Sequence, residues 1–407
     1  MNPKQYITQD DNSNIYAAPE LIRFGSNNLE DKKIKPLSLI VKSELFLSSD
    51  KQYLKAASIN TISFPIDELH LLRCKDAYVT TTYGVHDSHG LPFWNSVLSR
   101  GSHENNITYP RGVPKKVSQQ PQPHECEKQF DQAFYVNYLQ CRNFGHLLTE
   151  TASSLFPLFQ WIKRNSELAK IPIIINEYFS SQEFQINAFM EFSGITRDQI
   201  IIVGRDTQHV HIQNLYLAYP THANRRYVSR KHPKVVKTML KSIEKQAKAS
   251  TKDMHNNMDS SSKISSKVFI SRSRLNLNQR HLREEHQIEQ MLKKNGWTIY
   301  HPQSHSIAHQ KNTYETAKFI CGAEGSAFHL FYGCKLKKLR RVILLSKHKI
   351  NNFTLQFDAQ NINYKNITCL EPDPSSSCEK NTCENVILGP SYTASKIASI
   401  IRDETSL

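Results

Sequence analysis

One short segment combines a glycine turn with two side chains that can exchange protons. Residues 143–150 read NFGHLLTE, so His146 and Glu150 share one face if the segment is helical. Histidine titrates near neutral pH and suits a general base, and Glu150 can orient it or act as the base itself. Asn143 and Gly145 permit a tight turn into a helix whose free N–H groups favour anions. The alternative is a capped helix start whose carboxylate suits the helix dipole.

A second set of residues is suited to binding phosphate. It comprises Ser271, Arg272, Arg274, Arg280 and Glu285. The first three follow an apolar run directly, and side chains at i and i+2 of an extended chain point to one side. Arg272 and Arg274 can therefore form a forked clamp on phosphate oxygens, and Glu285 can pair with Arg280. The alternative is a basic surface turn on a basic protein.

A third set lies in the small-residue turn GAEGSA at residues 322–327. It comprises Glu324, Gly325, Ser326 and, slightly later, His329. Small residues let a ligand approach backbone N–H groups at a helix start, where they can bind a phosphate or a sugar. The turn lacks the dinucleotide pattern G-x-G-x-x-G, and a carboxylate in it favours sugar hydroxyls over a bare pyrophosphate. A tight turn that merely starts a helix is the alternative.

The elements that must hold the second and third sets read as a parallel α/β layer. Apolar runs at 267–270, 297–300 and 319–321 alternate with segments of helical periodicity. Both sets directly follow strands, and open α/β sheets bind ligands outside the carboxyl ends of their strands. Beyond this layer we expect a strand at 341–345, irregular chain at 364–390 and a terminal helix at 392–401.

The segment with His146 belongs to a second alternating region. Its expected strands are 133–138, 171–175, 199–203 and 211–219, and its expected helices are 147–162 and 182–192. A lysine-rich helix and a serine-rich linker follow. The predicted organisation has four parts: a β-rich portion at 1–128, a Rossmann-like domain at 129–249, a flexible linker at 250–266 and a second Rossmann-like domain at 267–407. The β-rich portion is expected to contain short strands such as 37–41, 61–64 and 76–82 and a proline-rich stretch at 110–124.

Composition limits the class of protein. A chain of 407 residues suggests two domains, and 39% hydrophobic residues suit a globular fold. The net charge of +15 points to anionic partners. We find neither a signal peptide nor the roughly 20 apolar residues of a spanning helix, which predicts a cytoplasmic protein. The lysine-rich helix leaves peripheral contact with the anionic inner face of the membrane open, although a surface helix packed on its own domain is favoured. The eight cysteines lack metal spacing and are expected to be buried free thiols.

Taken together, the motifs resemble glycosyltransferase family 61. In chain order they are N-F-G-H-x-x-x-E from Asn143, S-R-x-R from Ser271, R-x-L-x-x-E from Arg280, G-W-x-x-x-x-P from Gly296 and A-x-x-x-C-G-A-E-G-S-A from Ala317. Three departures bear on the donor sugar more than on the fold. Glu284 replaces a frequent Asn, His309 replaces the Glu of S-x-x-E-Q, and residues 324–327 replace H-G-A-G with a form associated with bacterial members.

This resemblance implies two facing Rossmann-like domains, the GT-B arrangement. It implies an inverting hexosyl- or pentosyltransferase that moves a sugar from a nucleotide-sugar donor to a hydroxyl of a growing surface glycan, such as capsule or lipopolysaccharide. The acceptor is then a glycan or glycolipid, and neither a metal nor another cofactor is expected. The second and third sets would bind the donor, Asn143 and Gly145 would lie on the acceptor side, and His146 and Glu150 would be catalytic.

Other classes of function compete with this interpretation. A non-catalytic glycan-binding or assembly protein on the same fold is the main alternative. A dinucleotide-dependent oxidoreductase is disfavoured because no glycine fingerprint is present. A nucleic-acid-binding protein would explain the charge, but the sequence carries no compact recognition motif.

Overall fold

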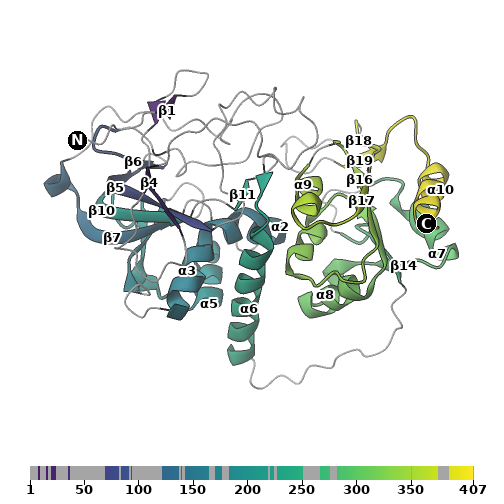
Figure 1. Ribbon diagram of the computed structural model, residues 1–407, viewed down its shortest axis with the longest axis horizontal. Coiled ribbons are helices and arrows are strands. Elements are labelled where there is room, and N and C mark those ends of the chain that lie inside the picture. The colour runs from purple at the N-terminus through teal and green to yellow at the C-terminus, as the bar shows by residue number, and fades with distance from the viewer. Residues whose placement is uncertain are drawn as a thin grey trace. The chain divides into compact units, whose positions relative to one another are not determined.

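The computed structural model shows a mixed α/β protein with two compact units, Met1–Met254 and His255–Leu407 (Figure 1). The structure describes short strands between residues 8 and 36, residues 69–93 and 122–250 with gaps, 266–275, 282–349, 351–374 and 385–406. The strands expected at 37–41 and 61–64, most of the stretch at 110–124 and most of the linker lie outside the described residues. The predicted four-part division stays a prediction.

An eight-stranded mixed sheet forms the centre of the amino-terminal unit. Its order is β4-β3-β5-β10-β7-β8-β9, with β6 beside β5. The strands β10, β7, β8 and β9 run parallel, whereas β5 is antiparallel to both β10 and β3. Their bounds are β3 Glu20–Arg23, β4 Lys35–Pro36, β5 His70–Thr80, β6 Val85–His86, β7 Lys128–Val136, β8 Ile173–Asn176, β9 Ile200–Val203 and β10 His209–Ala218.

The sheet curls like half of a barrel, so it differs from the open parallel sheet that the alternation of strands and helices predicts. Two strands separate β5 from β8, yet Asn176 Nδ2 at the end of β8 donates to the Thr80 carbonyl at the end of β5, at 2.8 Å. The long strands β5 and β10, of 11 and 10 residues, permit this curvature because twist accumulates along paired strands. Buried apolar residues from β5, β7, β8, β9 and β10 pack together in one core cluster of this unit.

Three helices pack together in the amino-terminal unit (Figure 1): α3 (Ala152–Arg164), α5 (Glu183–Ser193) and α6 (His232–Ser250). The apolar face of α6 is buried within this unit through Val235, Val236, Met239 and Leu240. Lys234 and Lys241 on its opposite side are exposed. The lysine-rich segment is therefore a surface helix packed on its own unit, as favoured from the sequence. Among the described residues, no helix has the length and apolarity to cross a bilayer.

The carboxy-terminal unit contains a parallel sheet, as predicted, but it has five strands where the sequence predicted four. Its order is β14-β13-β15-β16-β17, and every neighbouring pair is parallel. The strands are β13 Lys267–Ile270, β14 Thr298–Tyr300, β15 Phe319–Ala323, β16 Arg341–Ser346 and β17 Tyr364–Thr368. Counted along the chain, this is the order 2-1-3-4-5 of doubly wound folds. Ligands bind such sheets where the order reverses, here between β13 and β15.

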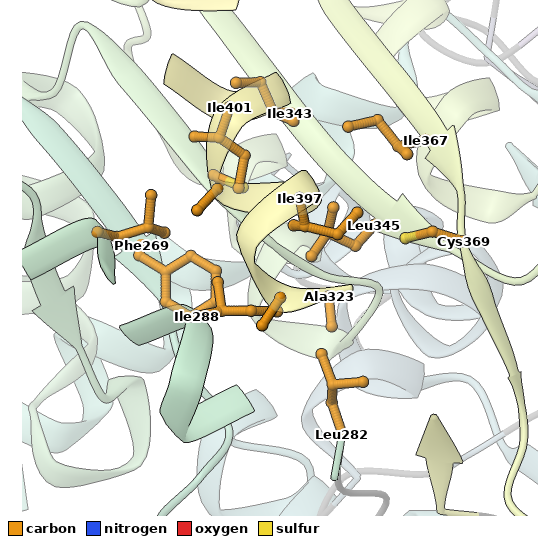
Figure 2. Packing of buried hydrophobic residues seen from close by; sticks show 14 of the residues in the cluster. Phe269, Leu282, Ile288, Ala323, Ile343, Leu345, Ile367, Cys369, Ile397 and Ile401 are labelled. Carbon is orange, nitrogen blue, oxygen red and sulfur yellow. The ribbon is translucent and has the colours of Figure 1, made fainter. Parts of the chain in front are cut away.

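Period-two alternation gives this sheet two apolar faces. Phe269, Cys321, Ile343 and Leu345 belong to one core cluster, which helices α7 (Glu285–Lys294) and α10 (Ala394–Glu404) cover. Figure 2 shows Ile288 of α7 and Ile397 and Ile401 of α10 among these strand residues. The alternate residues of the strands, such as Val268, Ile320 and Leu344, are also fully buried, which is why these strands read as continuous apolar runs.

The expectation of irregular chain at 364–390 was wrong. This region contains β17 and the paired strands β18 (Leu370–Pro372) and β19 (Val386–Leu388). Only Ile367 of β17 is buried, because an edge strand needs no apolar run. The glycine turn is followed by a 3₁₀ helix, η7 (Ser326–Gly333), and a helix not foreseen from the sequence, α9 (Asn352–Ala359), comes after β16.

The described cysteines agree with the expectation of buried free thiols. Cys74, Cys126, Cys321, Cys334 and Cys369 are all free and buried. Burial raises the pKa of Cys321 well above its ordinary value, which keeps that thiol protonated and unreactive.

Gly322 provides a test of how β13 and β15 pack. A Cβ atom at this position would lie 2.7 Å from the backbone carbonyl oxygen of Ile270, which cannot move without separating the two strands. We expect Gly322→Ala to lower the free energy of unfolding of the carboxy-terminal unit by about 1–3 kcal/mol. Chemical denaturation measures this change. A midpoint equal to that of the unmodified protein would contradict the proposed strand contact.

Candidate functional site

In the amino-terminal unit the structure brings His146 and Glu150 into direct contact. His146 Nδ1 lies 3.1 Å from Glu150 Oε2, and the two side chains are only 21% and 12% exposed. The Asn143 side chain accepts a hydrogen bond from the backbone N–H of His146, and Gly145 is buried at the same turn. With Nδ1 held by the carboxylate, Nε2 is the ring nitrogen that can exchange a proton with another molecule.

The turn that carries this pair is π-helical. It spans Leu147–Thr151, between the short α2 (Phe144–His146) and α3. The N–H of Ala152 donates to the carbonyl of Leu147, five residues back, and shares this proton with the carbonyl of Thr149. Single π-turns inside helices are rare and frequently mark functional sites. The sequence predicts one continuous helix here and gives no sign of the wider turn.

The carboxylate of Glu150 is enclosed by hydrogen-bond donors and positive charge. Burial by itself would raise its pKa, but the hydrogen bond and charge of His146, the nearby His222 and the hydroxyl of Thr149 outweigh burial and hold this pKa well below its usual range. Glu150 Oε2 accepts from Thr149, whereas the buried Oε1 has no hydrogen-bond partner among the described residues. Glu150 is thus ionised at neutral pH.

His222 joins this site from a segment 72 residues further along the chain. Strand β10 pairs in parallel with β7, and the register Leu217↔Tyr135 places their carboxyl ends side by side. The chain then continues from β7 into α2 and from β10 into the short β11 (His222–Ala223). Nothing in the local sequence marks His222, since only the pairing of β10 with β7 brings it near Glu150.

In the carboxy-terminal unit, Ser271 and Arg272 follow β13 and contact the turn after β15. Arg272 Nη1 donates to the carbonyl of Glu324 at 2.8 Å, and a Cβ atom on Gly325 would lie 3.2 Å from that nitrogen. The guanidinium therefore lies against the Glu324–Gly325 backbone, at the reversal of strand order. The second and third predicted sets meet here.

Two carboxylates of α7 hold the segment after β13. The backbone N–H of Arg272 donates to Glu285 Oε1 at 2.9 Å, and the hydroxyl of Ser271 donates to Glu289 Oε1. Burial raises the pKa of Glu285 to about 7, against the hydrogen bond and charge of Arg272. For Glu289, hydrogen bonds from Ser271, Ser273 and His286 outweigh burial and lower the pKa. Glu285 thus fixes the backbone of Arg272. Its expected pairing with Arg280 stays a prediction, because Arg280 lies outside the described residues.

The remaining predicted residues lie in different surroundings. Arg274 and Ser326 are exposed, and Arg280 lies outside the described residues. His329 is buried, and its Nδ1 lies 2.8 Å from Gln356 Oε1. The ring of His329 also stacks on Phe353, with 4.6 Å between ring centroids. These contacts occupy His329 inside the unit, and its donor-binding role stays a prediction.

Three rings stack after β14, a feature not predicted from the sequence. The rings of Tyr300, His305 and His309 are parallel within 13°, with 4.3 Å between the two histidine centroids. Tyr300 also ties this stack to the neighbouring strand end, because its carbonyl accepts from the N–H of Ser271 at 2.8 Å. Gln310 Nε2 donates to the carbonyls of Pro302 and His305, which holds the loop and leaves the exposed His305 ring in a fixed orientation.

Within the part of the chain that the structure describes, no group of three or more His, Cys, Asp or Glu residues is arranged to hold a metal ion. Metal independence stays a prediction.

The raised pKa of Glu285 predicts a pH dependence of stability. Its folded pKa of about 7 exceeds the ordinary value of 4.5, so the unfolded chain loses this proton first as pH rises. The stability of the carboxy-terminal unit should therefore fall by about 2–3 kcal/mol as pH rises through that interval. We expect Glu285→Gln to remove most of this loss of stability, because glutamine can still accept a hydrogen bond from the Arg272 N–H. Thermal denaturation measured from pH 4.5 to 8 tests this expectation.

Asp403→Asn is the matched control, because Asp403 is 71% exposed and pairs only weakly with Arg402, at 3.9 Å. This variant should keep the pH dependence of the unmodified protein. If Glu285→Gln kept it as well, Glu285 would not be the buried titrating group.

Several of these positions lie within a range that matches one known protein family. The sequence matches the model of the family described as Glycosyltransferase 61 over residues 144–335. No curated protein matches the chain. The matched range includes His146, Glu150, Arg272 and the turn at Glu324. Members of the family are glycosyltransferases, which use a sugar donor and a glycan acceptor. Over residues 144–335, slightly less than half of the chain, the sequence is thus similar to glycosyltransferase family 61.

Proposed function

We propose that the protein is an inverting glycosyltransferase of GT-B type that transfers a sugar from a nucleotide-sugar donor to a hydroxyl of a growing surface glycan. The observation that carries this proposal is the His146–Glu150 pair, an imidazole oriented by a buried carboxylate in a π-helical turn. Such a pair is suited to removing a proton from an attacking hydroxyl. The match to the family model over residues 144–335 supports glycosyl transfer in general.

The carboxy-terminal unit is proposed to bind the donor. Its sheet has the strand order of nucleotide-binding folds, and Arg272 lies at the reversal of that order. A guanidinium there can bind diphosphate oxygens through the N–H groups that face away from Glu324. The carboxylate of Glu324 can accept hydrogen bonds from the sugar. The exposed ring of His305 offers a flat surface on which a nucleobase can stack.

The amino-terminal unit is proposed to activate the acceptor. As the acceptor oxygen attacks the anomeric carbon, its proton passes to His146 Nε2, and Glu150 stabilises the imidazolium. The bond from the anomeric carbon to the diphosphate oxygen breaks on the opposite face, and its electron pair leaves with the nucleoside diphosphate. Arg272 stabilises that leaving charge, where electrostatic catalysis is most effective. Attack from the opposite face inverts the anomeric configuration.

The remaining parts of the proposal come from the family resemblance and the composition. The acceptor is a glycan or glycolipid of capsule or lipopolysaccharide type, and the reaction needs no metal. The protein is proposed to act in the cytoplasm, next to the inner face of the membrane where such glycans are assembled.

Substitutions of the pair test the proposed base. We expect His146→Ala and Glu150→Gln each to lower transfer about 10²–10⁴-fold, because a positioned general base contributes about that factor. The donor is first identified by thermal shift against a panel of nucleotide sugars, since a ligand of the folded state raises the melting temperature. Exposed His89 serves as control, and His89→Ala should transfer at the normal rate. Normal turnover in both pair variants would exclude the pair as the base.

Arg272 provides a separate test of donor binding. The ligand for this test is the nucleoside diphosphate that gives the largest thermal shift. We expect Arg272→Ala to weaken its binding about 10–100-fold, since a charge-assisted contact of about 1.4–3 kcal/mol is lost. Arg272→Lys should recover only part of this affinity because it lacks the planar fork. Lys293→Ala removes one positive charge at the other end of α7 and should bind normally. Unchanged calorimetric affinity in Arg272→Ala would contradict the assignment.

A non-catalytic glycan-binding protein on this fold gives a different result in the same assays. It would bind glycan and show neither transfer nor hydrolysis of any nucleotide sugar in the panel.

A further inference from the structure

We propose that His232 is a positioning residue for the His146–Glu150 pair, because its imidazole holds the π-helical turn Leu147–Thr151 through the carbonyl of Leu148. His232 is the first residue of α6, 82 residues beyond Glu150, and its side chain is completely buried. The catalytic meaning of this role rests on the proposed function, whereas the positioning itself is a structural property.

Both ring nitrogens of His232 have a hydrogen-bond partner. Nε2 lies 2.9 Å from the carbonyl oxygen of Leu148, and Nδ1 lies 2.8 Å from the hydroxyl oxygen of Thr221. A carbonyl can only accept, so Nε2 carries a proton and donates to Leu148. Thr221 can then donate its hydroxyl proton to Nδ1, which fixes the neutral tautomer.

The bond to Leu148 bears directly on the shape of the turn. In an α-helix the N–H of Ala152 would donate to the carbonyl of Leu148, four residues back. Here this N–H donates to the carbonyls of Leu147 and Thr149 instead, and His232 satisfies the Leu148 carbonyl from outside the helix. A buried carbonyl needs a hydrogen-bond partner. Without His232, the α-helical bond from the N–H of Ala152 to the Leu148 carbonyl therefore becomes more favourable. That change would alter the direction of Glu150 relative to His146.

Through Nδ1 and Thr221, His232 is also connected to the chain that follows β10 and contains His222. Ser153 Oγ of α3 accepts the backbone N–H groups of Thr221 and His222, at 2.6 and 3.1 Å. The rings of His222 and His232 lie 5.1 Å apart, between centroids. His232 thus links the π-helical turn to the chain after β10, and Ser153 in turn holds that chain to the start of α3. A rigid ring with a donor and an acceptor on different edges suits this role.

Titration of Glu150 tests the proposal without any substrate. The carboxyl carbon of Glu150 can be followed by NMR in protein labelled at glutamate, with Glu150→Gln identifying its signal. In His232→Leu, Glu150 should lose part of its contact with His146 but stay buried, so its pKa should rise by about 1 unit or more. His232→Gln keeps a donor for the Leu148 carbonyl and should shift the titration by less than half as much.

Two further variants distinguish a loss of positioning from a general loss of stability. Val236→Ala makes a cavity on the same helix, at a fully buried residue, and should lower the melting temperature without moving the titration of Glu150. Thr221→Val removes the hydroxyl partner of Nδ1 and should move the titration in the same direction as His232→Leu, by less. This milder variant decides the question if His232→Leu does not fold. Unchanged Glu150 titration in the folded His232 or Thr221 variants, or an equal shift in Val236→Ala, would overturn the proposal.

Transfer assays then connect positioning to catalysis. We expect His232→Leu to lower kcat at least tenfold while the affinity for the nucleoside diphosphate, bound by the other unit, stays within twofold. If the variants shift the Glu150 titration as expected but the unmodified protein transfers no sugar, the proposed function is rejected. The positioning role of His232 would still hold. Normal kcat in His232→Leu with a shifted Glu150 titration would show that the reaction does not depend on this pair.

Discussion

In each unit the candidate site depends on two parallel strands that end side by side although other elements separate them in the chain. Strand β10 lies beside β7, and β15 lies beside β13. Parallel strands present their carboxyl ends at the same edge of a sheet, so segments far apart in sequence are brought together there. This pairing places Thr221 and His222 next to the turn of Glu150, and the Glu324 backbone next to the guanidinium of Arg272.

A buried carboxylate stands at each of these strand ends, and its surroundings set its role. Glu150 is ionised because an imidazole, a hydroxyl and a second histidine compensate the cost of burial. Glu285 accepts a single backbone N–H, and its other oxygen has no partner among the described residues, so burial raises its pKa to about 7. The first carboxylate can stabilise a positive charge during a reaction, whereas the second mainly fixes the backbone of Arg272.

The elements of regular secondary structure could largely be predicted from local patterns. Short apolar runs such as Ile173–Asn176 and Ile200–Val203 became buried parallel strands, since only continuous apolar sequence can be covered on both faces. Prediction failed where burial is partial: the edge strand Tyr364–Thr368 has a mostly polar sequence, because only one of its residues needs to be buried. The curl of the amino-terminal sheet was also missed, since it arises from pairing among strands distant in sequence.

The residue types and local spacing of the candidate site follow from the sequence alone: a histidine four residues before a glutamate, an arginine just after a strand, and a small-residue turn, all within the range that matches the family model. Which of these groups meet depends on the three-dimensional fold. Glu285 binds the backbone of Arg272, and His222 and His232 join the site of Glu150 although no local pattern marks them. The physical reason is that a buried polar group must find partners in space, and strand pairing and helix packing determine which distant residues can provide them.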